Sequence, residues 1–161
     1  MSYDSRRDAY KHKFNIEYVY HKLFEPMISE RIETHDESKL CDPELACYNK
    51  WIPELQKVTV DDPKYAEIKQ MMRKDGLEHH YQVNRHHPEH FEHGISDMNL
   101  VDFVEHILDC YAASMESDTP FEVAMPSIME RNGYPKEIQN IVMNTAKLFK
   151  DNEMKAKRLG E

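Results

Sequence analysis

A helix-capping residue stands directly before a proline at three places in this chain, and this pairing strongly restricts the fold. The pairs are Asp42-Pro43, Asp62-Pro63 and Thr119-Pro120. Proline suits the first position of a helix because its φ is fixed near the helical value, and the preceding Asp or Thr caps free backbone N–H groups. Glu122, three residues after Thr119, completes a candidate capping box. Each pair therefore predicts the start of a helix.

Helical periodicity extends this prediction to the whole chain. Only four of the 161 residues are glycine, and strand-like alternation is scarce. We predict helices over about residues 5–32, 43–57, 63–83, 97–116, 120–131 and 135–155, with a kink or break at Pro26 and a turn at 94–97 that ends in a cap. The sequence thus predicts an all-α fold, a compact single-domain helical bundle over residues 1–161, in which residues 150–161 form a fraying tail.

Apolar stripes on three of the predicted helices indicate the core. The first helix presents Ile16, Val19 and Leu23; the fourth presents Leu100, Val104, Ile107 and Tyr111; and the last presents Ile138, Ile141, Val142, Ala146 and Leu148. The ten methionines are expected to fill irregular gaps between helices. Methionine and aromatic side chains suit a homo-oligomer interface as well as a core, so the oligomeric state stays open.

Charge and cysteine content exclude several classes of function. The net charge of −9 argues against tight non-specific binding to nucleic acid or to an anionic membrane, although a bound divalent metal would still allow a small anionic substrate. No apolar run approaches the roughly 20 residues that span a bilayer, and the first residues lack the apolar segment of a secretory signal. The odd number of cysteines (Cys41, Cys47 and Cys110) predicts reduced thiols in a cytoplasmic protein.

Six of the ten histidines fall within residues 79–93, namely His79, His80, His86, His87, His90 and His93. Imidazole is the commonest metal ligand among side chains. Because Pro88 disfavours helix at His87, the helix is expected to end near Asn84, with one His pair on each side of this transition. Arg85 is then placed to pair with a phosphate or carboxylate, while His90 and His93 are expected to be exposed.

Two further segments suggest ligands for the same site. His35-Asp36 joins a nitrogen ligand to a carboxylate, and since adjacent helical residues diverge by about 100°, both reach one ion only near a helix end or bend. His12 shares the stripe of Ile16, Val19 and Leu23, so its ring is expected to face inward. The chain between His12 and His35 is long enough for a helix and a return; His21 is the alternative, with less room.

The order of these residues resembles the HD-domain superfamily of metal-dependent phosphohydrolases, through His12, His35-Asp36, His79/His80, His86/His87 and Asp109. The resemblance implies an HD-domain-like helical fold in which His12, His35, Asp36 and Asp109 hold one cation. His80 with His86 and His87 would then bind a second ion or the substrate. The resemblance alone singles out Asp109, which a helical wheel places on an exposed acidic face with Asp102, Glu105 and His106. It also makes Lys39 a phosphate-contacting or proton-relaying residue.

Residues 12–112 resemble more closely a small, poorly characterised group of bacterial and phage proteins. The shared motifs are His12-Lys13, the His-Asp-x-Ser-Lys of residues 35–39 and the His-x-x-x-Asn-x-His-His of residues 80–87. This pattern favours His80 as a ligand, whereas helical periodicity favours His79. The choice between them, and that between His86 and His87, stays open.

The resemblance implies hydrolysis of a nucleotide or another small phosphoester by a metal-activated water. Mixed His and carboxylate ligands suit one or two ions of Mn, Fe, Co, Ni or Zn better than Ca. Asp36 or Asp109 would accept the proton of the water, and Lys39, Arg85 and His86 would contact the substrate. Two alternatives remain open: a non-catalytic metal- or nucleotide-binding regulatory module, and a di-iron HD-like oxygenase.

Overall fold

The computed structural model describes residues 4–59, 61–117 and 119–159, and within these ranges the chain forms helices and no strand. The α-helices are α1 (Arg6–Val19), α2 (Glu25–Glu33), α3 (Glu44–Leu55), α4 (Pro63–Met72), α5 (Glu78–Val83), α6 (Leu100–Glu116), α7 (Phe121–Arg131) and α8 (Lys136–Leu159). Short helical turns complete the set: η1 (Tyr20–Phe24), η2 (Glu37–Leu40), η3 (Arg73–Leu77), η4 (Pro88–His90) and η5 (Gly94–Asp97). The predicted all-α fold class is confirmed. Among the described helices, none has the length and apolar character needed to cross a membrane.

The proline pairs mark helix starts, with local differences from the prediction. Asp62 caps α4 by accepting a hydrogen bond from the backbone N–H of Lys64. The capping box predicted for Thr119 and Glu122 does not form, because Pro120 itself occupies the N-cap position of α7. Helix α6 begins three residues later than predicted. A capping box between Asn99 and Asp102 sets that start, and residues 94–97 form the separate turn η5.

Two of the predicted long helices contain a π-helical turn. The first runs from α1 through η1 into α2, and the π turn η1 ends just before Pro26, where the missing N–H disturbs regular α-helical bonding. The third is interrupted by η3 between α4 and α5. Helix α8 continues to Leu159, past the predicted end at residue 155 and through most of the segment expected to fray.

Two separate clusters form the core. The larger joins α6, α7 and α8 through Ile107, Phe121, Met125, Met129, Tyr134, Val142 and Ala146. The smaller joins α3, α4 and η3 through Cys47, Met72 and Leu77. Three buried methionines thus fill the gaps between helices as predicted. All three cysteines are free thiols, as the sequence predicts.

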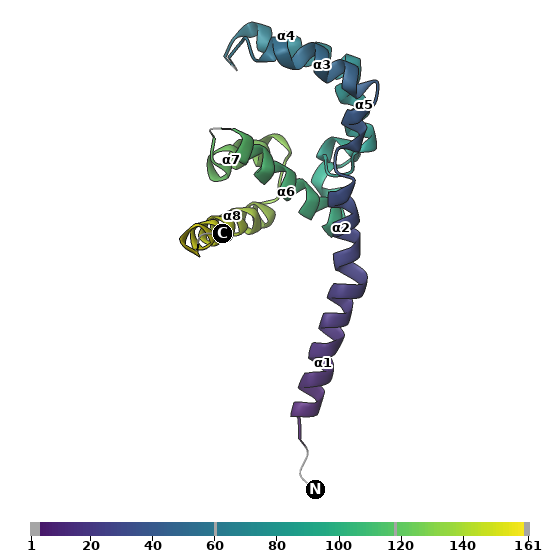
Figure 1. The fold of residues 1–161 in the computed structure, drawn as a ribbon, viewed down its shortest axis with the longest axis vertical. Helices are drawn as coiled ribbons and strands as arrows, with labels where there is room; N and C mark the ends of the chain where they lie inside the picture. Colours follow the sequence, from purple (N-terminus) through teal and green to yellow (C-terminus); the bar gives the residue numbers. More distant parts are fainter. Residues whose placement is uncertain (1–3, 60, 118, 160–161) are drawn as a thin grey trace.

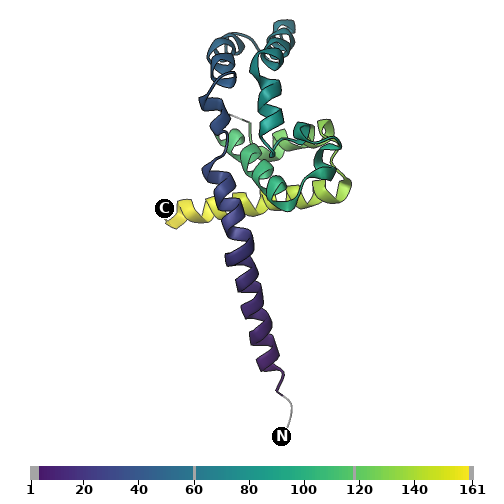
Figure 2. The ribbon, with the colours of Figure 1, turned by 90° about the vertical axis from the view of Figure 1, so that its right-hand side faces the viewer.

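Helix α1 projects away from the rest of the molecule, as Figures 1 and 2 show. None of its residues is buried. The stripe predicted to face the core is therefore exposed, since the exposed fractions of Ile16, Val19 and Leu23 are 56%, 50% and 51%. The core prediction is also wrong for Leu100, Ile141 and Leu148, which lie on the surface. Helical periodicity identified these apolar faces correctly but did not identify what covers them.

Candidate metal centre

His35 and Asp36 lie at the junction where α2 ends and η2 begins. Asp36 has a φ of 57°, in the left-handed region that residues other than glycine rarely adopt. This backbone conformation breaks the helical divergence between neighbouring side chains, so both residues face the same space. The sequence required a helix end or bend at this place, and the structure provides one.

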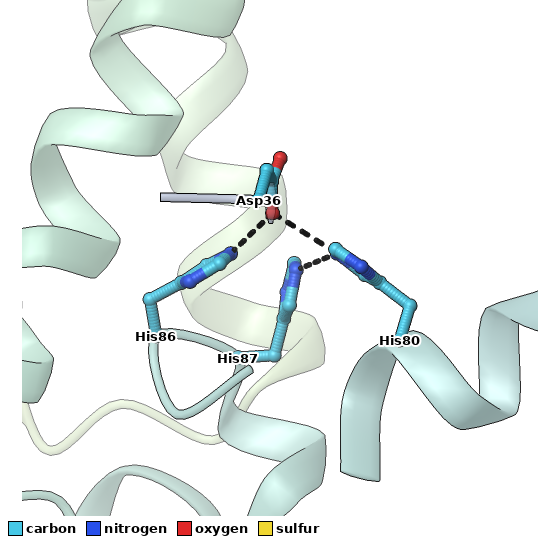
Figure 3. Close-up of side chains that lie close together, drawn as sticks. All are labelled: Asp36, His80, His86 and His87. Carbon is cyan, nitrogen blue, oxygen red and sulfur yellow. Dashed lines mark hydrogen bonds and ion pairs between the residues drawn. The ribbon is translucent and has the colours of Figure 1, made fainter. Parts of the chain in front are cut away.

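Asp36 meets three histidines at the end of α5 and in the loop that follows it (Figure 3). Its Oδ1 atom lies 3.5 Å from Nε2 of His80 and 3.5 Å from Nε2 of His86. The Nε2 atoms of His80 and His87 are 2.7 Å apart. One ligand atom from each of these four residues lies within 4.8 Å of all the others, a spacing that a single cation can bridge.

A second group of potential ligands shares two members with the first. It consists of His35, Asp36, His86 and Asp109, again with ligand atoms within 4.8 Å of one another. Nε2 of His35 lies 3.5 Å from Asp36 Oδ2 and 3.5 Å from Asp109 Oδ1. Because the two oxygens of Asp36 face different histidines, this carboxylate can serve two adjacent cations. The structure therefore contains six side chains that could bind one or two metal ions.

Buried carboxylates orient the histidine rings from behind. Glu105 Oε1 accepts hydrogen bonds from Nδ1 of His35 at 3.0 Å and approaches Nδ1 of His86 at 3.2 Å. Glu44 Oε2 lies 2.8 Å from Nδ1 of His80. In a neutral imidazole, a proton fixed on Nδ1 leaves Nε2 with a lone pair. Carboxylate support of this kind typically surrounds histidines that bind metals.

Glu105 is held in turn by a positively charged side chain from α2. Arg31 pairs with both Glu105 and Asp102. Asp102, fully buried on α6, also accepts two hydrogen bonds from Arg85, at 3.0 and 2.8 Å. These ion pairs connect α2, α6 and the loop after α5, the three segments that carry most of the potential ligands.

Burial keeps two of the histidines neutral. It lowers the pKa of His87 to about 2, aided by the neighbouring His86 and His80. Burial also lowers the pKa of His80, against the opposing effect of Glu44. His35 behaves oppositely, because its hydrogen bonds with Asp109 and Glu105 raise its pKa to about 10. A neutral imidazole is the form that binds a metal, so His80 and His87 are ready as ligands at neutral pH.

Two buried atoms at the centre lack hydrogen bonds. Asp36 Oδ1 and His86 Nε2 are shielded from solvent and make no hydrogen bond with the described residues. Leaving a buried polar atom without a partner costs about 1–3 kcal/mol. Both atoms belong to both groups of potential ligands. The donor set therefore fits a cation, which would bind these two atoms.

A cavity of about 290 Å³ adjoins the centre. His87, Asp109, Tyr81 and Arg131 are among the residues that line it. The side chain of Arg131 makes no hydrogen bond or ion pair within the ranges that the structure describes, so its charge is available at the cavity. The volume is close to the lower end of the range for small-molecule sites. The cavity therefore provides open space beside two of the potential ligands, His87 and Asp109.

The structure brings together most of the predicted metal ligands. His35, Asp36, His80, His87 and Asp109 lie at the centre, and His86, predicted as a substrate contact, also belongs to both groups of potential ligands. His12 does not reach the centre, because it lies on the exposed helix α1; contrary to the prediction, its ring does not face inward. His79 lies outside both groups and bonds to Glu44 at 2.7 Å.

Two predicted substrate-binding residues are paired within the protein. Arg85 is bound to Asp102, so it braces the loop instead of presenting a free guanidinium. Lys39 donates a hydrogen bond to Asp36 Oδ2 while its side chain stays partly exposed. Of the two histidines expected on the surface, His93 is exposed, whereas His90 is half-buried and bonds to the carbonyl of Tyr81.

The sequence did not single out the supporting residues. These residues are Glu44, Arg31 and Glu105. Glu105 lies four residues before Asp109 on α6, a helical spacing that places both on one face, and this was the available signal. Nothing comparable identifies Glu44, which comes to the site only because α3 packs against η2 and η3.

Comparison with known proteins gives a family. Residues 1–148 match the family of unknown function DUF5662. The chain belongs to this family. No curated protein and no solved structure matches the chain.

Proposed function

We propose that this DUF5662 protein is a metal-dependent phosphohydrolase with an HD-domain-like centre, acting on a nucleotide or another small phosphoester. One observation supports this proposal above the others: two groups of His and Asp ligands share Asp36 and His86 and adjoin a cavity with an unpaired arginine. The mixed nitrogen and oxygen donors favour Mn, Fe, Co, Ni or Zn.

A divalent cation bound here would lower the pKa of a coordinated water towards neutrality and polarise a phosphoryl oxygen. The protein supplies the remaining functions. Asp109 lines the cavity and is placed to accept a proton from an attacking water. Arg131 lines the same cavity and offsets the negative charge of a phosphate, and Lys39, held by Asp36, contributes a second positive charge.

The test begins with the metal content of protein purified without added metal, followed by a panel of phosphomonoesters and nucleotides. We expect a bound transition metal and turnover of at least one phosphoester. Asp36→Ala removes the shared carboxylate, so it should abolish metal retention and lower turnover by at least about 1,000-fold. Asp151→Ala, at an exposed position of α8, is the matched control and should leave both unchanged. Full activity in Asp36→Ala would reject the assignment.

The shared carboxylate also suits a di-iron oxygenase, which is the second candidate. Six His and Asp side chains around two adjacent positions fit two iron ions as well as they fit a hydrolase centre. Copurified iron with substrate-dependent uptake of O₂ would favour the oxygenase. Unfolding by a chelator, with neither hydrolysis nor O₂ uptake, would instead favour a non-catalytic regulatory module in which the ion holds the helices together.

A further inference from the structure

Helix α1 and its continuation through η1 into α2 present an apolar stripe to solvent. The stripe comprises Ile16, Val19, Tyr20, Leu23 and Met27, which recur at spacings of one to four residues and are 48–56% exposed. Figures 1 and 2 show α1 extending away from the body with no other helix beside it. Exposed apolar patches of this extent typically mark interaction sites.

The stripe continues into a cavity at the base of α2. Phe24 and Met27 line this cavity of about 510 Å³ together with Leu100 and Val101 from the start of α6. Leu100 is itself 64% exposed. The five side chains of the stripe and that of Leu100 expose roughly 100 Å² each. Their apolar area is therefore of the same order as the ~800 Å² that one partner buries in a standard interface.

The charges along the same helix indicate which partner covers the stripe. Residues 6–13 contain four basic side chains (Arg6, Arg7, Lys11 and Lys13) and one carboxylate, Asp8. Residues 25–33 contain three carboxylates (Glu25, Glu30 and Glu33) and one arginine, Arg31. A second copy in antiparallel orientation brings each basic half beside an acidic half, whereas a parallel copy brings like charges together. The charge pattern is therefore complementary to itself in the antiparallel arrangement only.

We infer that this protein forms a two-fold dimer in which the helices of residues 6–33 pair antiparallel along the stripe. With the axis near residue 20, Ile16 of one protomer lies opposite Leu23 of the partner subunit. The basic first turns of the partner then lie along α2, beside the cavity at its base. Because the pairing uses α1, it also accounts for a long helix that no described part of its own protomer covers.

The first test is the oligomeric state of the full chain by sedimentation equilibrium. We expect a dimer whose dissociation constant rises at least about 100-fold in Leu23→Glu, because the two-fold axis removes each leucine contact twice. Leu148→Glu is the matched control, since Leu148 is 56% exposed on α8. Circular dichroism verifies that both variants stay folded. A monomeric wild-type protein, or dissociation by Leu148→Glu alone, would overturn the inference.

The second test determines the orientation. Ile16→Cys and Leu23→Cys are placed separately in a background in which the exposed Cys41 is replaced by Ser, and the two proteins are mixed and oxidised. An antiparallel dimer should give cross-linked dimers of the mixture, with little cross-linking of either protein alone. Self cross-linking of Ile16→Cys would indicate parallel helices and would contradict the inferred arrangement.

Discussion

Replacing Glu105 by Gln tests whether buried carboxylates orient the metal ligands. Glu105 is 2% exposed; its Oε1 atom faces Nδ1 of His35 and His86, while its Oε2 atom pairs with Arg31. Glutamine has nearly the same shape but carries one oxygen and one NH₂ group. With the oxygen towards the histidines, the NH₂ group meets the Arg31 guanidinium. With the amide flipped, the NH₂ group meets both Nδ1–H groups. Neither orientation satisfies both sides.

The size of the effect follows from the two ligands involved. Loss of one carboxylate that supports a metal-binding histidine typically lowers metal affinity 10–100-fold, or about 1.4–2.7 kcal/mol. Glu105 supports His35 and His86, and His86 belongs to both groups of potential ligands. We therefore expect Glu105→Gln to weaken binding of Mn²⁺ or Zn²⁺ towards the upper end of this range, about 100-fold. Metal-free stability should fall by about 1–3 kcal/mol, because a buried hydrogen bond is lost.

Titration calorimetry with a competing chelator measures the affinity, and urea unfolding measures the stability. Glu67→Gln, the same substitution at an exposed position of α4, is the control and should change neither quantity. If Glu105→Gln bound metal within about twofold of the wild type, carboxylate support would not orient these ligands, and the reasoning would fail.

Two further predictions concern stability. The pKa of His35 is raised to about 10 in the folded protein, so the folded protein keeps a proton that the unfolded chain releases above about pH 6.5. Metal-free protein should therefore lose stability as pH rises from about 6.5 to about 10. His35→Gln should flatten that slope in urea unfolding by at most about 1.4 kcal/mol per pH unit; an unchanged slope would contradict this role. An alanine Cβ at Gly76 would lie 2.6 Å from Cβ of Cys47, so Gly76→Ala should cost about 1–3 kcal/mol. Gly133→Ala meets no atom within 4 Å, but an alanine there needs a φ of 62°, so the substitution should cost about 1–2 kcal/mol of stability. A Gly76→Ala variant as stable as the wild type would refute the steric argument.

The helical architecture was largely predictable because local signals determine it. Pro63 after Asp62 predicts the start of α4, and the structure begins the helix there. The start of α6 was displaced because two capping residues lie close together in the sequence, and Asn99 rather than Asp97 pairs with the turn that follows. Local propensity gave the elements, whereas competition between neighbouring caps decided their ends.

His12 shows what periodicity does not determine. The stripe that it shares with Ile16 and Val19 is real, but a period of 3.6 residues identifies a face and not its partner. The prediction assumed that the covering surface belongs to the same protomer. Since α1 has no such cover in the structure, the assumption failed, and His12 lost its expected position at the site with it.

The acidic face of α6 gives the converse case. A helical wheel correctly grouped Asp102, Glu105, His106 and Asp109, but the face reads as a solvated one when α6 is considered alone. In the structure Asp102 and Glu105 are buried, because Arg31, His35 and Arg85 come from distant segments to pair with them, and the buried His106 bonds to Tyr134. Only the tertiary fold supplies these partners, so no pattern within residues 100–116 predicts that burial.

The cost of this buried network supports a role beyond stability. Buried ion pairs commonly stabilise a fold no better than apolar side chains of similar volume, because taking charges out of water is expensive. Glu44, Asp102 and Glu105 are nevertheless all buried in a protein with a net charge of −9. Two of them, Glu44 and Glu105, hold histidines by Nδ1 and leave Nε2 facing the centre, where Asp36 Oδ1 and His86 Nε2 still lack a hydrogen bond. Unpaired buried atoms cost free energy, and these two belong to both groups of potential ligands, so the arrangement favours a cation-binding site.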